Sequence, residues 1–247
     1  MTDLSARWPL GLSRSTWLLW SLVAIAVLGA LSWFDPAAAL AVRANNHGIV
    51  GFFEGLTRYG ETDWILIPSL LLLVVSAALL LVIRKYSPRL ALLQNAQIFG
   101  FIFVAIGLPG LVATLLKRLI GRGRPPQFDE FGQYHFQPIW NDYFYQAFPS
   151  GHATTGLGLA FVIGFLAPRY FPLALVFGVG IAISRVVVGA HSVSDILAGA
   201  ILGTIGAYLI RNFFADRRWV FENTADGVVT RDPVGIQRLL RRQRARR

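Results

Sequence analysis

Residues 184–195 read SRVVVGAHSVSD and connect two apolar runs, residues 171–189 and 192–210. A membrane-spanning helix needs about 20 mostly apolar residues, and both runs approach this length when the flanking motif residues belong to the helices. Further apolar runs of similar length precede them, at residues 15–34, 64–83, 90–116 and 151–168. The sequence therefore predicts six spans, with both termini on one side of a membrane.

The composition also favours a membrane domain. Of the 247 residues, 55% are hydrophobic and 15% are charged, whereas a soluble domain carries about 25% charged residues. The chain has no cysteine, which excludes disulfides and thiolate metal ligands. No polar linker divides the apolar region. We therefore expect an all-α integral membrane six-helix bundle at residues 15–211, between a cytoplasmic N-terminus (1–14) and a basic cytoplasmic tail (212–247).

Lysine and arginine residues indicate the orientation, because positively charged loops stay in the cytoplasm. With both termini inside, the inner side holds the arginine-rich tail and a set of further cations, Arg7, Arg14, Arg84, Lys85, Arg89 and Arg169. Most cations on the outer side lie within or beside three short motifs, where a function would account for them. We therefore expect cytoplasmic termini and motifs that meet on the outer face.

Both terminal segments allow alternatives. Arg7 and Arg14 precede the first run and residues 37–39 are alanines, as in a secretory signal, but this run is longer than the about 7–15 residues of a signal core. We expect a retained helix. The basic tail is expected to lie on the anionic inner leaflet. A solvated, disordered tail is the alternative, and nucleic acid is not expected as a partner.

The segment Pro149-Ser150-Gly151-His152 begins the run at 151–168. Serine is a favoured helix N-cap, and a preceding proline discourages the helix from extending backward. The first turn of a helix has unpaired N–H groups and a partial positive charge, and Gly151 lets an anion approach closely. The segment predicts a phosphate site with His152 beside it as a proton donor. A capped helix with a surface histidine is the alternative.

His191 and Asp195 are four residues apart, so they share one face of a helix. A carboxylate beside an imidazole fixes its tautomer and stabilises its cation, which leaves the other nitrogen free to attack. Arg185 precedes His191, and ionisable residues near membrane spans are costly and usually functional. A structural His–Asp pair with a snorkelling arginine is the alternative.

Residues 117–125, KRLIGRGRP, place Lys117 and Arg124 around a glycine-rich turn. Arginine offers a planar fork for phosphate oxygens, and lysine offers a compact charge. Arg118 and Arg122 are extra cations beside this turn, and the alternative is that they face lipid headgroups, as arginines at a membrane edge usually do. A generic basic loop is the alternative. The sequence contains no cluster typical of a magnesium or zinc site, so we expect phosphate-ester chemistry without metal.

Three signatures occur in order with every position filled: K-x6-RP at 117–125, PSGH at 149–152 and SR-x5-H-x3-D at 184–195. The chain thereby resembles the type-2 phosphatidic acid phosphatase superfamily of membrane lipid phosphatases, including bacterial inner-membrane enzymes of the phosphatidylglycerophosphatase B and undecaprenyl-diphosphatase type. Soluble vanadium haloperoxidases share the signatures, but this chain is too hydrophobic for that branch. The resemblance covers residues 117–195 closely, but not the tail or the loop 127–147.

The resemblance implies a role for each signature residue. His191 is implied as the nucleophile that forms a phosphohistidine, Asp195 as the residue that orients it, and His152 as the general acid for the departing alkoxide. The groups implied to bind the phosphate oxygens are Lys117, Arg124, Ser150, Gly151 and Arg185. Neither a metal nor a cofactor is implied. Water would then complete hydrolysis of a lipid phosphomonoester or diphosphate at the periplasmic leaflet.

The sequence leaves several alternatives open. Family members act on phosphatidate, phosphatidylglycerol phosphate, undecaprenyl diphosphate or lipid A phosphates, and neither the lipid nor the oligomeric state follows from these residues. The intermediate could instead pass to a lipid acceptor, as in a phosphotransferase, or the cations could serve a lipid carrier or flippase. Residues 48–58 fit an interfacial amphipathic helix or a packed loop, and Trp140, Tyr143, Phe144 and Tyr145 suit a membrane interface.

Overall fold

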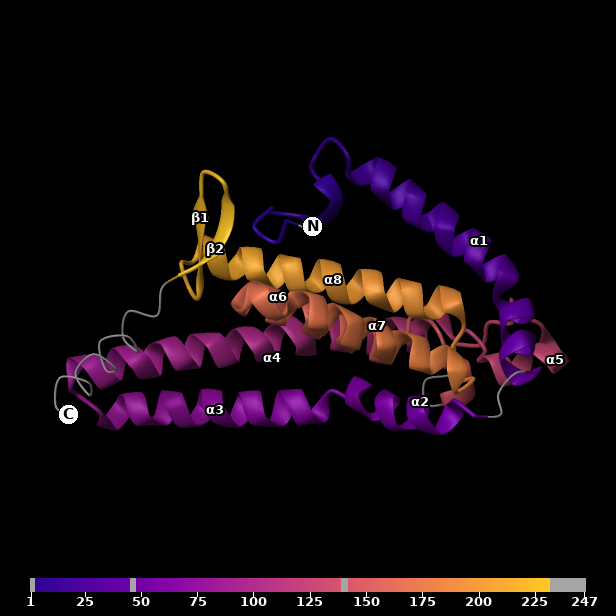
Figure 1. Cartoon of the computed structure of the whole chain (residues 1–247), viewed down its shortest axis with the longest axis horizontal. Helices are drawn as coiled ribbons and strands as arrows, with labels where there is room; N and C mark the ends of the chain where they lie inside the picture. Colours follow the sequence, from indigo (N-terminus) through magenta and orange to yellow (C-terminus); the bar gives the residue numbers. More distant parts are fainter. Residues whose placement is uncertain (1–2, 45–47, 139–141, 232–247) are drawn as a thin grey trace.

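The computed structural model describes residues 3–44, 48–138 and 142–231. These residues are mainly helical, with one small β-hairpin, and this confirms the all-α fold class (Figure 1). The longest helices are α1 (Trp17–Ala44), α3 (Asp63–Val82), α4 (Tyr86–Ile120), α6 (Gly151–Leu166), α7 (Phe171–Val187) and α8 (Val193–Asp216). The shorter elements are α2 (Val50–Thr57), α5 (Phe128–Phe131), β1 (Phe221–Thr224), β2 (Gly227–Thr230) and the 3-10 turns η1 (Pro9–Gly11), η2 (Arg58–Gly60), η3 (Pro125–Gln127), η4 (Tyr143–Tyr145) and η5 (Pro168–Tyr170).

Five helical segments are long and apolar enough to cross a membrane: Trp17–Ala44, Val50–Val82, Tyr86–Ile120, Pro168–Val187 and Val193–Asp216. Helices suit this environment because every backbone polar group must find its partner within the protein. The first helix continues beyond its predicted end at residue 34 to Ala44. Asp35, the residue that follows the predicted run, therefore lies inside α1, and it is buried. Residues 50–57 are helical, as one of the two alternatives for segment 48–58 proposed.

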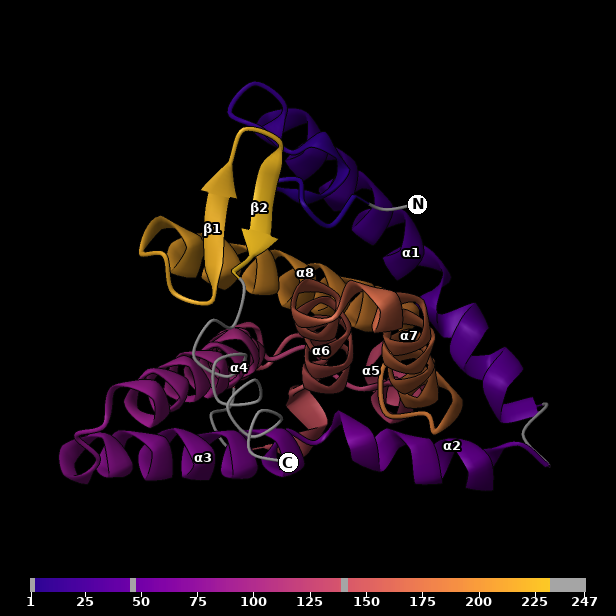
Figure 2. The same ribbon diagram turned by 60° about the vertical axis from the view of Figure 1, so that its left-hand side comes forward.

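Helix α6 is shorter and lies at the centre of the bundle (Figure 2). Its 16 residues extend about 24 Å, less than the ~30 Å hydrocarbon core. Six spans therefore stay a prediction. Small residues bring its neighbours close: a Cβ on Gly156 would lie 2.8 Å from the Gly178 carbonyl oxygen of α7, and one on Gly203 of α8 would lie 2.2 Å from the Thr154 carbonyl oxygen. Such contacts let helix backbones approach and hold α6 between α7 and α8.

An aromatic core fills the end of the bundle that carries the hairpin. The Phe101 ring meets the Phe221 ring of β1 at 4.8 Å between centroids, and both are buried. Arg211 of α8 donates hydrogen bonds to the carbonyl oxygens of Leu4, Ala6 and Arg7. The described part of the segment predicted as a tail is therefore folded, with α8 continuing to Asp216. Residues 232–247, which hold six of the nine arginines of the predicted basic tail, lie outside the described residues.

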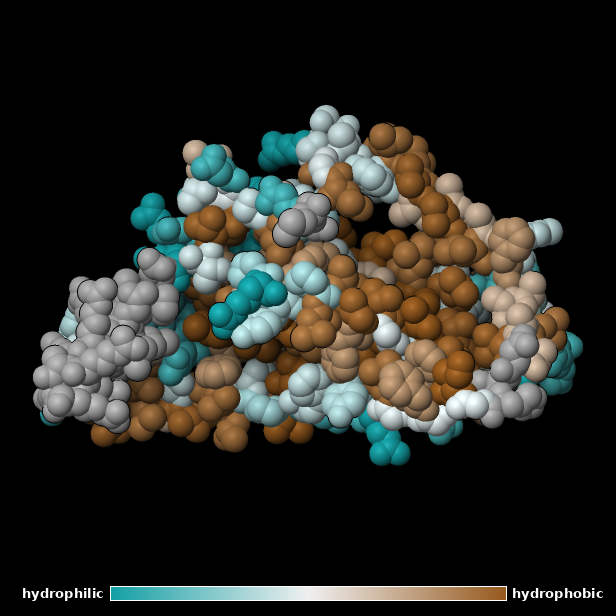
Figure 3. All heavy atoms as spheres, in the orientation of Figure 1, coloured by the Kyte–Doolittle hydropathy of each residue, from teal (hydrophilic) through white to brown (hydrophobic). Residues whose placement is uncertain are grey.

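Apolar side chains cover much of the molecular surface (Figure 3). Trp33 of α1 is 70% exposed and Leu81 of α3 is 84% exposed. An exposed apolar surface of this extent suits contact with lipid. Helix α1 leans away from the bundle in Figures 1 and 2, and Asp35 is the one residue of α1 that is buried.

Candidate active site

Four helix ends meet at the end of the bundle that lies far from the hairpin. They are the C-terminal ends of α4 and α7 and the N-terminal ends of α6 and α8. In Figure 1, α7 ends and α8 begins here, beside α5 and the last turns of α1. The eight signature residues that were given a role all lie in these four ends or in the turns between them. The fold therefore gathers three motifs that are far apart in the chain.

The N-terminus of α6 lies directly beside a cation. The Ser150 hydroxyl accepts a hydrogen bond from the Ala153 N–H at 3.5 Å, so serine caps this helix as predicted. Ser150 is completely buried, and its own N–H donates to the Asp195 carbonyl oxygen at 3.0 Å. The Lys117 Nζ atom lies 3.4 Å from the position that a Cβ on Gly151 would occupy. A positive side chain and the positive end of a helix thus share one space.

Two glycines turn the chain into the site. Helix α4 ends at Gly121 with φ +65°, and helix α7 is followed by Gly189 with φ +69°. Both values lie in the left-handed region, where glycine avoids the steric cost that other residues meet. The turn at Gly121 directs Arg122 and Arg124 into the protein interior, where the two residues are 3% and 5% exposed.

Arg124 is held by three backbone carbonyl groups. Its Nε donates to Tyr143 at 2.9 Å, and its two terminal nitrogens donate to Ala190 at 2.9 Å and to Gln146 at 3.3 Å. Its guanidinium carbon lies 3.8 Å from the Tyr143 ring centroid, a cation–π contact. Burial lowers the pKa of Arg124 from its ordinary value, but an arginine keeps its charge in proteins. The contacts aim a fixed positive charge beside His191.

Arg185 approaches the same space from α7. One terminal nitrogen donates to the Thr57 hydroxyl at 2.8 Å, and its main-chain carbonyl accepts from the His191 N–H at 3.0 Å. Its Nε atom is buried and has no hydrogen-bond partner among the described residues. A buried donor of this kind costs free energy unless a partner arrives. An anionic ligand in the site would supply that partner.

His191 and Asp195 form a buried pair at the start of α8. The His191 Nδ1 atom lies 3.6 Å from the Asp195 Oδ2 atom, and the two side chains are 2% and 0% exposed. Burial lowers the pKa of His191 to about 4, although the nearby Asp195 acts in the opposite direction. The imidazole is therefore neutral at physiological pH and keeps a lone pair for attack. Asp195 Oδ2 also accepts the Ser192 N–H at 2.9 Å, so it caps α8 as well.

Arg122 is a residue whose position the sequence analysis predicted wrongly. It was expected to be an extra cation of the phosphate site or to face lipid headgroups, but it bonds to Asp195 Oδ1 at 2.7 Å and to Asp35 Oδ2 at 2.8 Å. A carboxylate in or near a membrane span needs a partner, because an unpaired charge there is costly. Because Asp35 directly follows an apolar run, its need for a partner is the signal that would have predicted a buried arginine. Nothing in the motif spacing indicated Thr57 or Tyr143 as site neighbours.

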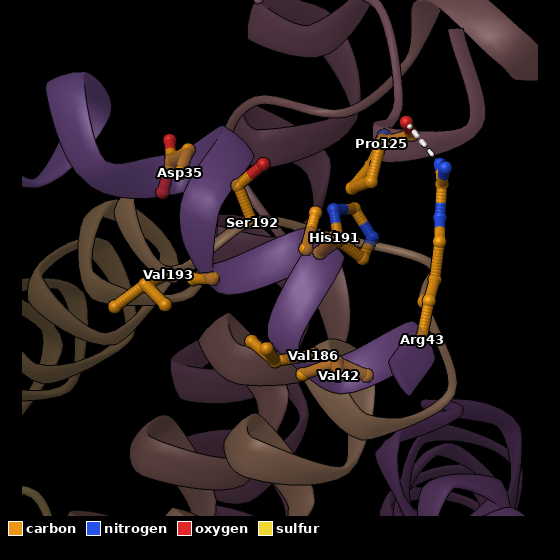
Figure 4. Close-up of a pocket in the computed structure, with 11 residues that line it drawn as sticks. Asp35, Val42, Arg43, Pro125, Val186, His191, Ser192 and Val193 are labelled. Atoms are coloured by element: carbon orange, nitrogen blue, oxygen red, sulfur yellow. Dashed lines mark hydrogen bonds between the residues drawn. The ribbon is translucent and has the colours of Figure 1, made fainter. Parts of the chain in front are cut away.

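The site borders two cavities of different size. One of about 20 Å³ lies between α1 and His191, with Asp35, Ser192 and Pro125 around it, and Arg43 donates to the Pro125 carbonyl at 2.8 Å (Figure 4). It has room for about one water molecule. The other, of about 360 Å³, has His152, Thr114, Thr155 and Leu111 in its wall. Space for part of a substrate therefore lies on the His152 side.

Metal-ligating groups do not gather in the parts of the chain that the structure describes. No set of three or more His, Asp or Glu side chains there is arranged to hold a metal ion. The charged groups placed to meet an anion are the cationic side chains of Lys117, Arg124 and Arg185. Trp140, predicted to suit an interface, lies outside the described residues.

Comparisons with known proteins agree with this geometry. Residues 99–219 match the model of the PAP2 superfamily. A lipid A 1-phosphatase of Rhizobium johnstonii is 32% identical over 174 residues, which cover 70% of this chain and 71% of that protein. The chain belongs to the PAP2 superfamily. This membership confirms the family resemblance of the three signatures and makes the protein a phosphoric-ester hydrolase.

Further PAP2 relatives point to a membrane lipid phosphatase. The phosphatidylglycerophosphatase B of Bacillus subtilis is 26% identical over 170 residues, covering 64% of this chain and 72% of that protein. The crystal structure of a transmembrane PAP2-type phosphatidylglycerolphosphate phosphatase from the same species matches with a TM-score of 0.50 and 25% identity, over 83% of this chain and 95% of that chain. The protein is therefore an integral membrane phosphatase of PAP2 type.

Proposed function

We propose that this protein hydrolyses the phosphomonoester or diphosphate of a membrane lipid through a phosphohistidine on His191. The observation that carries the proposal is the buried, neutral imidazole of His191, with Asp195 on one side and two arginines nearby. Asp195 stands beside Nδ1, which leaves Nε2 for attack on phosphorus. Arg124 and Arg185 both act electrostatically on His191. Lipid phosphates are therefore the expected substrates, and no cofactor takes part.

In this mechanism the phosphate oxygens bind between Lys117, Arg124, Arg185 and the N-terminus of α6. The Ser150 cap fixes that helix end, and Gly151 leaves its backbone open to the ligand. The unpaired Nε of Arg185 donates to one phosphate oxygen. Charge that develops on the transferring phosphoryl group is met by donors that are already in place, which is the largest contribution to such catalysis.

The first chemical step forms a P–N bond and breaks a P–O bond. The lone pair on Nε2 of His191 attacks phosphorus, and the lipid oxygen leaves with its bonding electrons. His152 donates a proton to that oxygen, so the lipid departs as a neutral alcohol from a phosphomonoester or as a lipid monophosphate from a diphosphate. Asp195 stabilises the positive charge on the phosphorylated imidazole.

The second step returns the enzyme to its starting state. A water molecule attacks the phosphohistidine, and the deprotonated His152 takes a proton from it. The P–N bond breaks and its electrons return to Nε2 of His191. The products are inorganic phosphate and a neutral histidine, so atoms and charges balance over the cycle. A lipid alcohol in place of water would make the enzyme a phosphotransferase, and product analysis separates the two reactions.

The cavity of about 360 Å³ beside His152 suits the leaving group, because the general acid must contact the departing oxygen. Apolar Leu66 and Leu111 share its wall with Thr114 and Thr155. Relatives that are 32% identical are lipid A 1-phosphatases, and another relative acts on phosphatidylglycerol phosphate by its name. We rank a lipid A 1-phosphate first and phosphatidylglycerol phosphate second among substrates to assay.

The proposed site faces the periplasm, and both termini are cytoplasmic. The supporting observation is the distribution of lysine and arginine residues between the two ends of the bundle. Most of the described cations outside the motifs lie at the end of the bundle opposite the site, among them Arg7, Arg14, Arg84, Lys85 and Arg169. The positive-inside bias assigns that end to the cytoplasm. Cysteine labelling of single-cysteine variants in intact cells tests this orientation, since the native chain has no cysteine.

A phosphate-release assay tests the proposed activity. The purified full-length protein is given short-chain lipid phosphates with EDTA present, and free phosphate is measured. The His191→Ala variant is expected to lose nearly all turnover, whereas His135→Ala, a histidine stacked on Phe131 in the α5 loop, is expected to keep it. Wild-type turnover in His191→Ala would overturn the mechanism. Lipid movement across vesicles that survives the loss of His152 and His191 would support a carrier instead.

A further inference from the structure

A buried chain of charges links helix α1 to the proposed nucleophile. Arg122 Nη1 donates to Asp195 Oδ1 at 2.7 Å and to the Ser194 hydroxyl at 2.6 Å, and its Nη2 donates to Asp35 Oδ2 at 2.8 Å. The Arg122, Asp195 and Asp35 side chains are only 4%, 0% and 0% exposed. The other Asp195 oxygen is the one that faces His191. Arg122 thus holds Asp195 from the side opposite the imidazole.

Asp35 in turn holds Arg122. Asp35 Oδ2 accepts both Arg122 Nη2 and the Ser194 hydroxyl, and its Oδ1 accepts the Ser194 N–H at 3.2 Å. Ser194 lies next to Asp195 on the first turn of α8. Asp35 therefore fixes the arginine and the helix turn that carries the carboxylate with the same side chain. Bidentate contacts of this kind set geometry as well as energy.

The contact between Asp35 and Arg122 is also the deepest attachment of α1 to the bundle. Asp35 is the one buried residue of this helix. Nearby, Arg43 forms an ion pair with Asp129 at 2.5 Å, but both of these side chains are substantially exposed. A buried carboxylate on an otherwise lipid-facing helix is costly, so it calls for a function beyond anchoring.

From these contacts we infer that Asp35 and Arg122 are positioning residues: together they orient Asp195, and through it His191, so α1 is part of the catalytic scaffold. Neither residue touches the phosphate, and each acts through Asp195. Loss of either one lets the carboxylate rotate away from Nδ1 of His191. The chemical step then slows while lipid binding is unchanged. The inference rests on the proposed role of His191.

Kinetics of full-length variants test this inference. Arg122→Gln and Asp35→Asn are expected to lower kcat about 10- to 100-fold, because small misplacements of a reacting group cost this much. Their KM values are expected to stay within about twofold, since uniform substrate binding is not removed. Asp129→Asn is the matched control, because it breaks the exposed tether of α1 without contacting Asp195. It is expected to keep wild-type kcat.

A double variant separates positioning from simple stability. Because Asp35 and Arg122 orient the same carboxylate, the loss of kcat in the double variant is expected to be smaller than the product of the two single losses. Arg122→Lys is expected to recover only part of the rate, because a single ammonium cannot fork between two carboxylates. If Arg122→Gln does not fold, Asp35→Asn decides alone, since the amide keeps the shape and its one oxygen can still accept the Ser194 N–H.

Each outcome has one meaning. Wild-type kcat in Asp35→Asn, losses that appear in KM, or losses that multiply in the double variant would overturn the positioning role. An equal loss in Asp129→Asn would assign the effect to general attachment of α1 and would also overturn it. His191→Ala is assayed in the same experiment, to distinguish failure of the positioning inference from failure of the proposed role of His191. If His191→Ala is inactive and Asp35→Asn is normal, the positioning inference alone fails.

Discussion

The Nδ1 atom of His191 lies 3.6 Å from Oδ2 of Asp195, with both side chains buried. The distance is longer than a hydrogen bond, and we expect the neutral imidazole to move closer to the carboxylate when it gains positive charge. This geometry predicts that Asp195→Asn lowers kcat by about 10²- to 10⁴-fold, since a neutral amide neither stabilises the imidazolium nor fixes the tautomer. Steady-state phosphate release measures the change. A loss of less than about tenfold would show that the pair is only a helix cap.

The titration of His191 provides a second prediction. Its pKa is lowered by burial from the ordinary 6.5 to about 4 in the folded protein. Between these pH values the unfolded chain binds a proton on this histidine and the folded protein does not, so the free energy of unfolding falls as pH drops from 6.5 to 4. The nucleophile itself stays neutral and active until the pH nears 4.

Thermal unfolding of the wild type and of His191→Gln tests this pH dependence. The glutamine cannot titrate, so the wild type should lose stability relative to the variant between pH 6.5 and pH 4.5. The expected sign is a wild-type Tm that falls faster. A difference between the two proteins that is constant over this range would contradict the buried, neutral histidine.

Gly60 provides a test of His152 that leaves the histidine itself intact. A Cβ on Gly60 would lie 2.5 Å from the His152 Cδ2 atom, closer than real contacts permit. Gly60→Ala should therefore displace the imidazole and lower kcat by about 10²-fold, because general acid catalysis contributes about 10²- to 10⁴-fold. Gly55→Ala on α2 is the matched control, since a Cβ there has nothing within 4 Å. Equal activity of the two variants would argue against His152 as the acid.

Gly203 provides a test of the helix packing that positions the site. A Cβ there would lie 2.2 Å from the Thr154 carbonyl oxygen, and the backbone cannot move aside easily. Gly203→Ala is expected to destabilise the protein by about 1–3 kcal/mol, the usual cost of overpacking. A Cβ on Gly29 of α1 would meet no atom within 4 Å, so Gly29→Ala should leave Tm unchanged. Melting curves in the same detergent compare them, and a stable Gly203→Ala would show that α6 and α8 do not pack this closely.

Much of the helical fold was predictable from hydropathy, because long apolar runs in this chain have to become helices in a membrane. The motif residues were proposed from chemistry, since phosphate requires cations and a helix N-terminus, and the fold brings them together. The end of α1 was not, because the uncharged run stops at residue 34 and the sequence does not show the buried partners of Asp35. Arg122 was missed for the same reason. Its partner Asp35 is distant in sequence, and only the tertiary fold brings them together.

The hairpin β1–β2 also escaped the sequence analysis. Its strands have four residues each, too short for an alternating pattern to stand out from the basic segment around them. It forms because Phe221 and Val228 enter the aromatic core, which also contains Tyr208 and Phe214 of α8. Tertiary packing of this kind overrides the weak local preference of a short strand.

Trapping the covalent intermediate tests the central proposal most directly. The purified protein is mixed with a ³²P-labelled short-chain lipid phosphate, quenched in alkali within the first turnover and digested for peptide mapping. We expect acid-labile label on the peptide that contains His191, and none in His191→Ala. Label on another residue, or wild-type turnover by His191→Ala, would contradict the account.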